Sequence, residues 1–447
     1  MNDYAADLKT ALGTLRAKAV AHGPFFAYYR GDHPSVYAAS RLSSVFRQID
    51  VHFAENWCAP VIDTLLDRLN LHGIKGPAAS QDVLDAFWAR EQVGIESHET
   101  ASDVAVCGES YVIVWPDDQE IVRSYRNKPE MCHIWYDPDK PRVKIRAAKW
   151  WLDEDKAAKR HVTLYYPDEF VHFVSRGKGA EARSERSFEM EADPEPNERG
   201  IIPVFHLRSH TSTISGELQN ALPVQMAINR VADDMMVASE YSAFKQRWAI
   251  SGADPGDLRA APGTTIVIPP APADEQAVSV GEFTATELPN YIAAIEHLAN
   301  AMAAITRTPK NFFFQAAGGN VSGDALIAME AQLAKKAAYY QARLGVTWRE
   351  IAAFVCLLAG QKVPSEDIEA VWSEQRTVQP VAEATALAQM VAAGVPLKTA
   401  LRRQGWNQAD LDQLDKDAAE VSSSKTNLAA QMLAQARAKL NQGGVPA

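Results

Sequence analysis

The stretch that decides the fold runs from residue 307 to residue 360 and reads RTPKNFFFQAAGGNVSG, then DALIAMEAQLAKKAAYYQARLGVTWREIAAFVCLLAG. Its first part predicts a loop over 307–322, because paired glycines interrupt regular structure. Residues 323–360 contain no proline and are rich in Ala, Leu, Glu and Lys, which predicts one long helix with Ser322 as its N-cap. At 1.5 Å per residue this helix would be roughly 50–55 Å long.

Two helical stretches flank a different kind of segment just upstream of that loop. Apolar residues at helical spacing predict helices over 216–250 and 289–306. Between them, residues 251–288 carry five prolines and six acidic residues against one arginine, around a strand-like run at 264–268. This composition predicts an acidic β insert between two helices.

The first half of the chain contains two regions with different sequence patterns. Residues 1–100 show helical spacing of apolar residues and predict a mainly helical region. From 103 to 210, β-branched and aromatic runs, among them Val104–Val106 and Tyr111–Trp115, predict a small and mostly antiparallel β region. The polar stretch 175–199 within it predicts an exposed loop.

The C-terminal part changes character again. Residues 361–420 predict a short strand at 368–372 and then alanine-rich helices, whereas the polar residues 421–447 predict a mobile or weakly helical tail. The whole pattern predicts an α+β fold that is predominantly α-helical.

Composition limits the classes of function. The formal net charge is −11, whereas a protein that grips DNA through its phosphates needs a basic excess. We therefore expect no tight or sequence-reading DNA binder, although a weakly repulsive wall would let DNA slide past. The sequence shows no long apolar stretch and no signal peptide, which predicts a protein without a membrane span that is cytosolic where it is made.

No catalytic, cofactor or metal motif is found. The four cysteines are scattered without a CxxC pair, and no GxxxxGK[ST], GxGxxG or HExxH occurs. In GNVSG at 319–323 the serine stands one place too late for a nucleophile elbow, so Ser322 is better explained as a helix cap. We expect neither an enzyme nor a protein with a cofactor or metal.

The sequence resembles the Gp6-like group of tailed-phage portal proteins. Five stretches carry the resemblance, in chain order: YYRGDH at 28–33 with Asn56, Val61 and Arg68–Leu69; DVAVCGESYVIVW at 103–115; GIIPVFHLR at 200–208, leading to 216–218; AINR at 227–230 through YSAFKQRW at 241–248; and TRTPKNFFF at 306–314 through NVSGDAL at 320–326, followed by Glu330. None is a strict functional motif, and their order and spacing make the case.

The resemblance implies a cyclic ring, typically of twelve subunits, with regions named wing, stem, clip and crown. Mapped onto this chain they are the wing (1–215 and the long helix 323–360), the stem helices (216–250 and 289–306), the clip (251–288), a channel or tunnel loop (307–322) and the crown (361–420), with 421–447 as a flexible tail. Such a ring is the head-to-tail connector at a capsid vertex through which double-stranded DNA is packaged and ejected without sequence specificity.

The same resemblance gives candidate site residues and partners. Candidate DNA-channel residues lie in or beside the loop: Arg307, Lys310, Gly318, Gly319, Asn320, Ser322 and Gly323. Asp274, Glu275 and Glu282 are candidates for adaptor contact at the clip. The implied partners are terminase, a head-tail adaptor and the major capsid protein, and the implied location is the virion, with host cytoplasm during assembly.

Two alternatives stay open at this point. A non-channel head-assembly or adaptor protein would be a structural protein of a different kind, although it would not need the helix–insert–helix unit with its loop and long helix. A phage nuclease or ligase would need clustered metal-binding carboxylates or an activated nucleophile, and the sequence shows neither.

Overall fold

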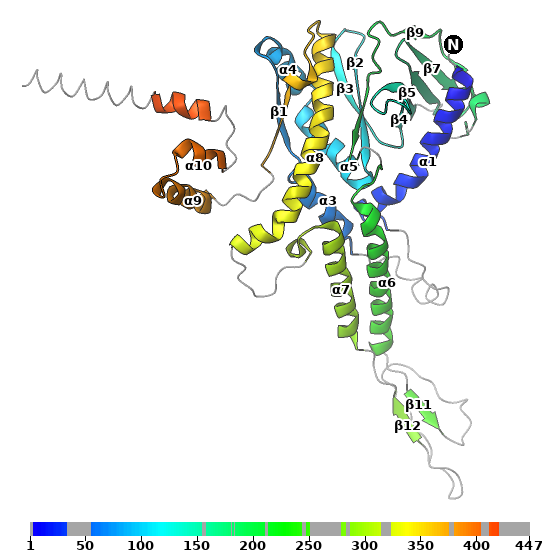
Figure 1. The fold of residues 1–447 in the computed structure, drawn as a ribbon. Helices are drawn as coiled ribbons and strands as arrows, with labels where there is room; N and C mark the ends of the chain where they lie inside the picture. Colours follow the sequence, from blue (N-terminus) through cyan, green and yellow to red (C-terminus); the bar gives the residue numbers. More distant parts are fainter. Residues whose placement is uncertain are drawn as a thin grey trace, which may run out of the picture. The chain divides into compact units, whose positions relative to one another are not determined.

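The computed structural model describes residues 3–33, 55–153, 158–179, 181–182, 184–210, 213–243, 247–250, 279–282, 287–313, 323–374, 380–403 and 411–419. They fall into two compact units, 1–376 and 377–447. The first unit contains both helices and sheets (Figure 1), which confirms the α+β fold class.

The chain begins with helix α1 (Tyr4–Arg30), shown in blue in Figure 1. The side chain of Asp3 caps its first turn by accepting from the backbone N–H of Ala6 at 3.1 Å. One face of α1 buries Leu8, Leu12 and Leu15 against an antiparallel sheet, where they join a hydrophobic cluster with apolar residues of the sheet. The predicted helical spacing at the N-terminus is therefore confirmed.

The sheet under α1 belongs to a β-rich region between residues 109 and 208. Its strands are β4 (Cys132–Tyr136), β5 (Lys144–Leu152), β6 (Arg160–Tyr165), β7 (Glu169–Ser175), β8 (Phe188–Met190) and β9 (Glu195–Pro196). A second sheet has the order β10-β2-β3, from β10 (Val204–Arg208), β2 (Glu109–Pro116) and β3 (Val122–Asn127). All pairings are antiparallel, as predicted.

Two expectations about this region were wrong. Val104–Val106 is not a strand, because it forms the last turns of helix α5 (Val93–Cys107), which ends at Gly108 in a left-handed conformation (φ 100°). The polar stretch 175–199 is not simply an exposed loop. It contributes β8 and β9 to the sheet and buries Phe188, because the partner strand β7 lies close by.

A strand also occurs within the region 1–100, which was expected to be mainly helical. Residues 71–75 form β1 (Leu71–Lys75), which pairs antiparallel with β13 (Glu369–Trp372) from the far end of the first unit. Helices α3 (Cys58–Leu66), α4 (Ala78–Arg90) and α5 surround β1 in the chain, so the expected helices of this region are present. The strand 368–372 predicted from the sequence is confirmed as β13.

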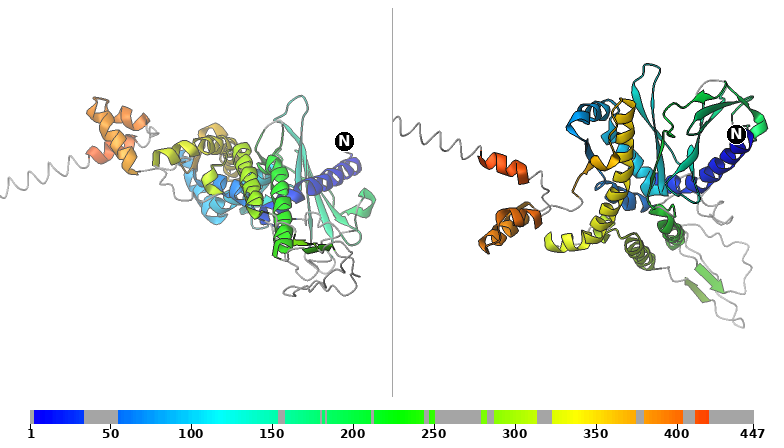
Figure 2. Two further views of the ribbon diagram at one scale, coloured as in Figure 1. Left: turned by 90° about the horizontal axis from the view of Figure 1, so that it is seen from below. Right: turned by 45° about the horizontal axis from the view of Figure 1, so that its top comes forward.

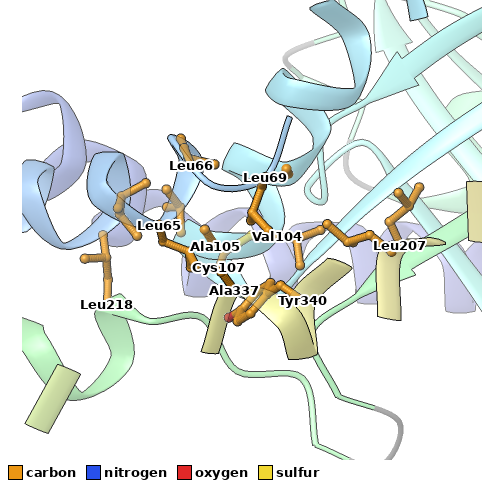
Figure 3. Packing of buried hydrophobic residues seen from close by; sticks show 14 of the residues in the cluster. Leu65, Leu66, Leu69, Val104, Ala105, Cys107, Leu207, Leu218, Ala337 and Tyr340 are labelled. Carbon is orange, nitrogen blue, oxygen red and sulfur yellow. The ribbon is translucent and has the colours of Figure 1, made fainter. Parts of the chain in front are cut away.

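The largest hydrophobic core lies where α3, α5, β10, α6 (Leu218–Ala243) and α8 (Gly323–Leu358) meet. Figure 3 shows Leu65, Val104, Leu207 and Leu218, from four of these elements, in the cluster that also contains Tyr340 of α8. The predicted long helix is confirmed as α8, which spans 36 residues and buries Trp348 completely. Helix α8 therefore ties elements from distant parts of the sequence into one core.

Below this core in Figure 1, α6 and α7 (Leu288–Thr306) pack side by side. Helix α7 matches the predicted helix 289–306, but α6 ends at Ala243 instead of continuing to residue 250. Residues Arg247–Ile250 form strand β11, which pairs antiparallel with β12 (Ser279–Glu282). Strand β12 provides a hydrogen-bonding partner for residues 247–250, and Trp and Ile favour strands when a neighbouring strand is present. This explains why these residues form a strand and not the end of a helix. The strand-like run 264–268 lies outside the described residues.

The second unit contains helices α9 (Pro380–Ala392) and α10 (Leu397–Arg403), and residues 411–419 are also helical. These helices agree with those predicted after residue 380. The expected tail, residues 421–447, lies outside the described residues.

Candidate channel-loop anchor

The predicted loop residues fall on both sides of a gap in the described structure. Arg307 and Lys310 are described, and both side chains are exposed. Gly323 is the first residue of α8. Gly318, Gly319, Asn320 and Ser322 lie outside the described residues, as do Asp274 and Glu275 of the predicted clip. Glu282 ends β12, where its backbone lies opposite Arg247.

The segment that leads into the loop is tightly organised. Helix α7 ends at Thr306, whose buried hydroxyl donates to the carbonyl of Met302 at 2.7 Å and lies 3.1 Å from Oγ1 of Thr308. Arg307 then adopts a left-handed conformation (φ 53°, ψ 34°), and the N–H of Thr308 bonds back to the carbonyl of Ala303. A non-glycine residue in this region costs roughly 1–2 kcal/mol, so the surrounding contacts must hold the reversal in place.

A buried lysine provides the strongest of those contacts. The Lys336 ammonium, from the middle of α8, donates to the carbonyl of Thr306 at 2.7 Å and to the Glu217 carboxylate at 3.0 Å. The other carboxylate oxygen of Glu217 accepts from the Tyr340 hydroxyl at 3.0 Å. Because Glu217 directly precedes α6 and Thr306 ends α7, this group joins both helices to α8. We call Lys336, Glu217, Tyr340 and Thr306 the clamp.

Burial decides the electrostatics of the clamp. The Lys336 side chain is 1% exposed and that of Glu217 is 14% exposed. Burial lowers the pKa of Lys336 below its ordinary value, while the charge of Glu217 acts in the opposite direction. Burial, followed by the same carboxylate, raises the pKa of Tyr340 well above 10. Lys336 therefore depends on Glu217 for compensation of its buried charge.

Close backbone packing sets the position of Glu217. The N–H of Glu217 donates to the carbonyl of Ala105 in α5 at 2.8 Å. The preceding residue is Gly216, where an added Cβ would lie only 2.2 Å from the carbonyl oxygen of Val106. Glycine is required here because the two backbone segments touch. The start of α6 is thereby locked onto the end of α5.

A second set of contacts holds the residues after the reversal. The ring of Phe313 stacks on Trp57 with centroids 5.6 Å apart, and the Arg68 guanidinium lies 5.9 Å from the centroid of Phe312. Arg68 also forms a 2.8 Å ion pair with Glu330 in the second turn of α8, and both side chains are nearly buried. These contacts therefore hold the segment 306–313 against the residues just before α3, the residues just after α3, and α8.

Sequence reasoning missed the clamp. Arg68, Glu217 and Glu330 fall within the stretches that carry the family resemblance, but no role followed from their positions. Lys336 had one readable signal: it stands on the same helical face as Leu333, Ala337 and Tyr340, where a lysine needs a buried partner. The partner itself, 119 residues away in sequence, could not be identified from spacing.

The arrangement offers mechanical positioning of the segment that leads into the loop. Within the described residues no group of three or more His, Cys, Asp or Glu side chains could hold a metal ion, and all four cysteines are buried as free thiols. The search for membrane spans, made over the same residues, finds no helix long and apolar enough to cross a bilayer.

Comparison with known proteins gives the class. The profile of the phage portal proteins of the SPP1 Gp6-like type matches residues 26–424, so the chain belongs to that family. Among its relatives is the portal protein of Mycobacterium phage D29, which is 25% identical over 388 residues covering 79% of this chain and 76% of that protein. The portal protein of Mycobacterium phage L5 is 24% identical over 386 residues with the same coverage.

Proposed function

We propose that this protein is one subunit of a portal ring at a capsid vertex, the connector through which double-stranded DNA enters the head and later leaves it. The observation that carries the proposal is the family match over residues 26–424. The structure adds a physical reason, because an anchored segment leads from the α6–α7 pair into the proposed channel loop. The family resemblance favours a ring of twelve subunits. Such a ring closes through head-to-tail contacts between neighbouring subunits.

The regions of the subunit are assigned as follows in this proposal. Residues 1–215 and 323–360 form the wing, 216–250 and 289–306 the stem, and 251–288 the clip. Residues 307–322 form the channel loop, 361–420 the crown and 421–447 a flexible tail.

We further infer that DNA meets few attractive charges in this channel. A net charge of −11 disfavours tight phosphate binding, so DNA can slide without being trapped. Arg307 and Lys310 are exposed cations at the entrance of the loop and are the best described candidates for transient phosphate contacts. Specific recognition then falls to proteins: a head-tail adaptor that docks at the clip through Asp274, Glu275 and Glu282, the terminase, and the major capsid protein.

A non-channel head-assembly or adaptor protein is the second candidate function. Such a protein would share the virion location but would not form a ring around DNA. The family match over most of the chain does not favour it, and no contact in the described structure points to it.

The channel assignment predicts a selective defect in the double variant Arg307→Glu, Lys310→Glu. We expect several-fold less DNA packaged per head with normal ring assembly, because two carboxylates would replace the cations that face the DNA. The measurement is DNA content of purified heads together with the yield of rings. Lys140→Glu, at an exposed lysine of the β4–β5 turn, is the matched control and should package normally. Unchanged packaging in the double variant would remove these two residues from the channel.

A further inference from the structure

A groove lies on the outside of the first unit between α8 and the segment that leads into β13. Its volume is about 580 Å³. Ala338, Ala342 and Gly345 of α8 line one side, and Ile368, Ala370 and Trp372 line the other. The edge of β13 away from β1 is unpaired among the described strands. The site already described uses none of these six residues.

The groove has an apolar floor and a charged rim, as protein interfaces do. Gly345 lets the helix approach the strand, because an added Cβ would lie 3.2 Å from Nε1 of Trp372. Three charged residues also line the groove: Arg349 of α8, which is half-buried, and Glu366 and Glu369, which are exposed and form no ion pair with another described residue.

The outer face of α1 carries a stripe of exposed small residues and an exposed cation. Ala6, Thr10, Gly13, Ala17 and Val20 are exposed at spacings of four and three residues, so they form one narrow stripe on the helix. Gly13 has open space around it, and nothing in the subunit itself accounts for a glycine inside this helix. Val20, at 79%, has the largest exposed fraction among the large apolar side chains described.

One exposed cation accompanies this stripe. Lys9 lies beside Thr10 and makes no ion pair with another described residue. It therefore matches the unpaired carboxylates of Glu366 and Glu369 at the rim of the groove. Small residues allow two helices to approach closely, while Lys9 and the rim acids would set the direction of the contact.

The two surfaces cannot meet within one subunit. In Figure 1, and again in the right view of Figure 2, α1 lies on one side of the first unit, whereas α4 and β1, the strand that pairs with β13, lie on the opposite side of α8. A contact between them must therefore join two copies through different faces. Contacts of this head-to-tail kind are the ones that close into rings.

We propose that the groove between α8 and β13 receives the outer face of α1 from the neighbouring copy of this chain, with Lys9 placed at Glu366 and Glu369. This inference rests on the proposed ring and names the surfaces that build it. Along the ring, each subunit gives its first helix to one neighbour and its groove to the other.

Cysteine cross-linking of the full-length chain tests the contact. In the double variant, each subunit carries both Ala17→Cys and Ala342→Cys. Rings assembled from it should give a ladder of covalent oligomers on mild oxidation. Each single variant should give none, since the four native thiols are buried. A mixture of the two single variants should stop at covalent dimers, because each subunit then offers only one reactive partner.

Several outcomes would overturn the contact. Rings that form normally without a ladder in the double variant would contradict the interface alone, whereas an absence of rings in the unmodified chain would instead contradict the proposed function. Protection of the introduced thiol in Ala342→Cys from alkylation in dissociated subunits would assign the groove to a segment of the same chain.

Substituting a bulky residue on the outer face of α1 tests the same contact through ring assembly, without oxidation. Gly13→Trp adds a large side chain in space that is open in the subunit, so its folding, followed by circular dichroism, should be preserved. We expect at least a tenfold lower fraction of rings by size-exclusion chromatography, while Gly13→Ala keeps ring formation. Normal assembly of Gly13→Trp would contradict the contact.

Discussion

Replacing Lys336 by methionine should lower the free energy of unfolding of the first unit by about 3–5 kcal/mol, the range observed when one partner of a buried ion pair is removed. Methionine keeps the length and volume of the side chain but leaves the Glu217 carboxylate without its cation. It also leaves the carbonyl of Thr306 without its 2.7 Å donor. Urea unfolding followed by tryptophan fluorescence, at one fixed protein concentration, measures the loss.

Two controls separate the clamp from a general effect of losing a cation. Arg176→Met removes one partner of an exposed pair of the same unit, in which Arg176 and Glu189 are 64% and 52% exposed, and should cost less than about 1 kcal/mol. The double variant Lys336→Met, Glu217→Gln should lose less than the sum of the single variants, since no buried charge is then left uncompensated. A loss below 1 kcal/mol in Lys336→Met would refute the clamp.

The second large effect is expected at Glu109, which is almost completely buried at the start of β2. Its carboxylate receives Lys18 of α1 at 2.7 Å, His22 at 3.1 Å, the Tyr111 hydroxyl at 2.7 Å and His206 of β10 at 3.0 Å. We expect Glu109→Gln to cost about 3–5 kcal/mol, because the Lys18 ammonium would stay nearly buried without its partner. Asp32→Asn, which breaks an exposed pair with Arg30, should cost less than about 1 kcal/mol.

The same network makes the protein sensitive to acid. Burial lowers the pKa of His206 from 6.5 to about 4 despite the opposing carboxylate. For Glu109, burial favours the neutral form, but the hydrogen bonds from His206 and His22 and the charge of Lys18 outweigh it and hold its pKa far below 4.5. In both cases the unfolded chain binds protons first as the pH falls, so acid favours unfolding.

The expected pH dependence of stability follows directly. The melting temperature should fall as pH drops from about 6.5 toward 4, where unfolded His206 takes up protons, and fall further below about 4.5 through Glu109. Each unit of pKa displacement corresponds to roughly 1.4 kcal/mol. Glu109→Gln should flatten the decline below pH 4.5. An unmodified protein equally stable at pH 7 and pH 4 would contradict this description of the network.

Local signals in the sequence were sufficient for the long helices. Residues 323–358 and 288–306 form helices close to their predicted limits because they combine helix-forming composition with flanking breakers. Where the structure differs, a distant partner decided the outcome. Residues 71–75 became a strand because β13 lies beside them, and the helix from 218 ends at Ala243 because β12 pairs with 247–250. Short segments do not contain the information about such partners.

In the candidate site, too, some residues could be predicted from the sequence and others depended on distant partners. Arg307 and Lys310 became candidates because the family resemblance identifies 307–322 as a channel loop, and the structure finds both exposed. The groups that hold the loop's entrance, Lys336 and Glu217, are 119 residues apart and meet only through the packing of α5, α6 and α8. Glu109 likewise has partners 87 and 97 residues away. Buried ion pairs between distant segments are the part of the site that a single sequence does not reveal.

The central claim is that this chain closes into a ring with an axial channel. Negative-stain electron microscopy of the purified full-length protein, together with its native mass, tests this most directly. We predict discrete rings with a central opening and a single mass on the order of half a megadalton, as expected for about twelve subunits in a closed cyclic assembly. A stable monomer under every condition tried, or open filaments with no closed ring, would contradict the claim.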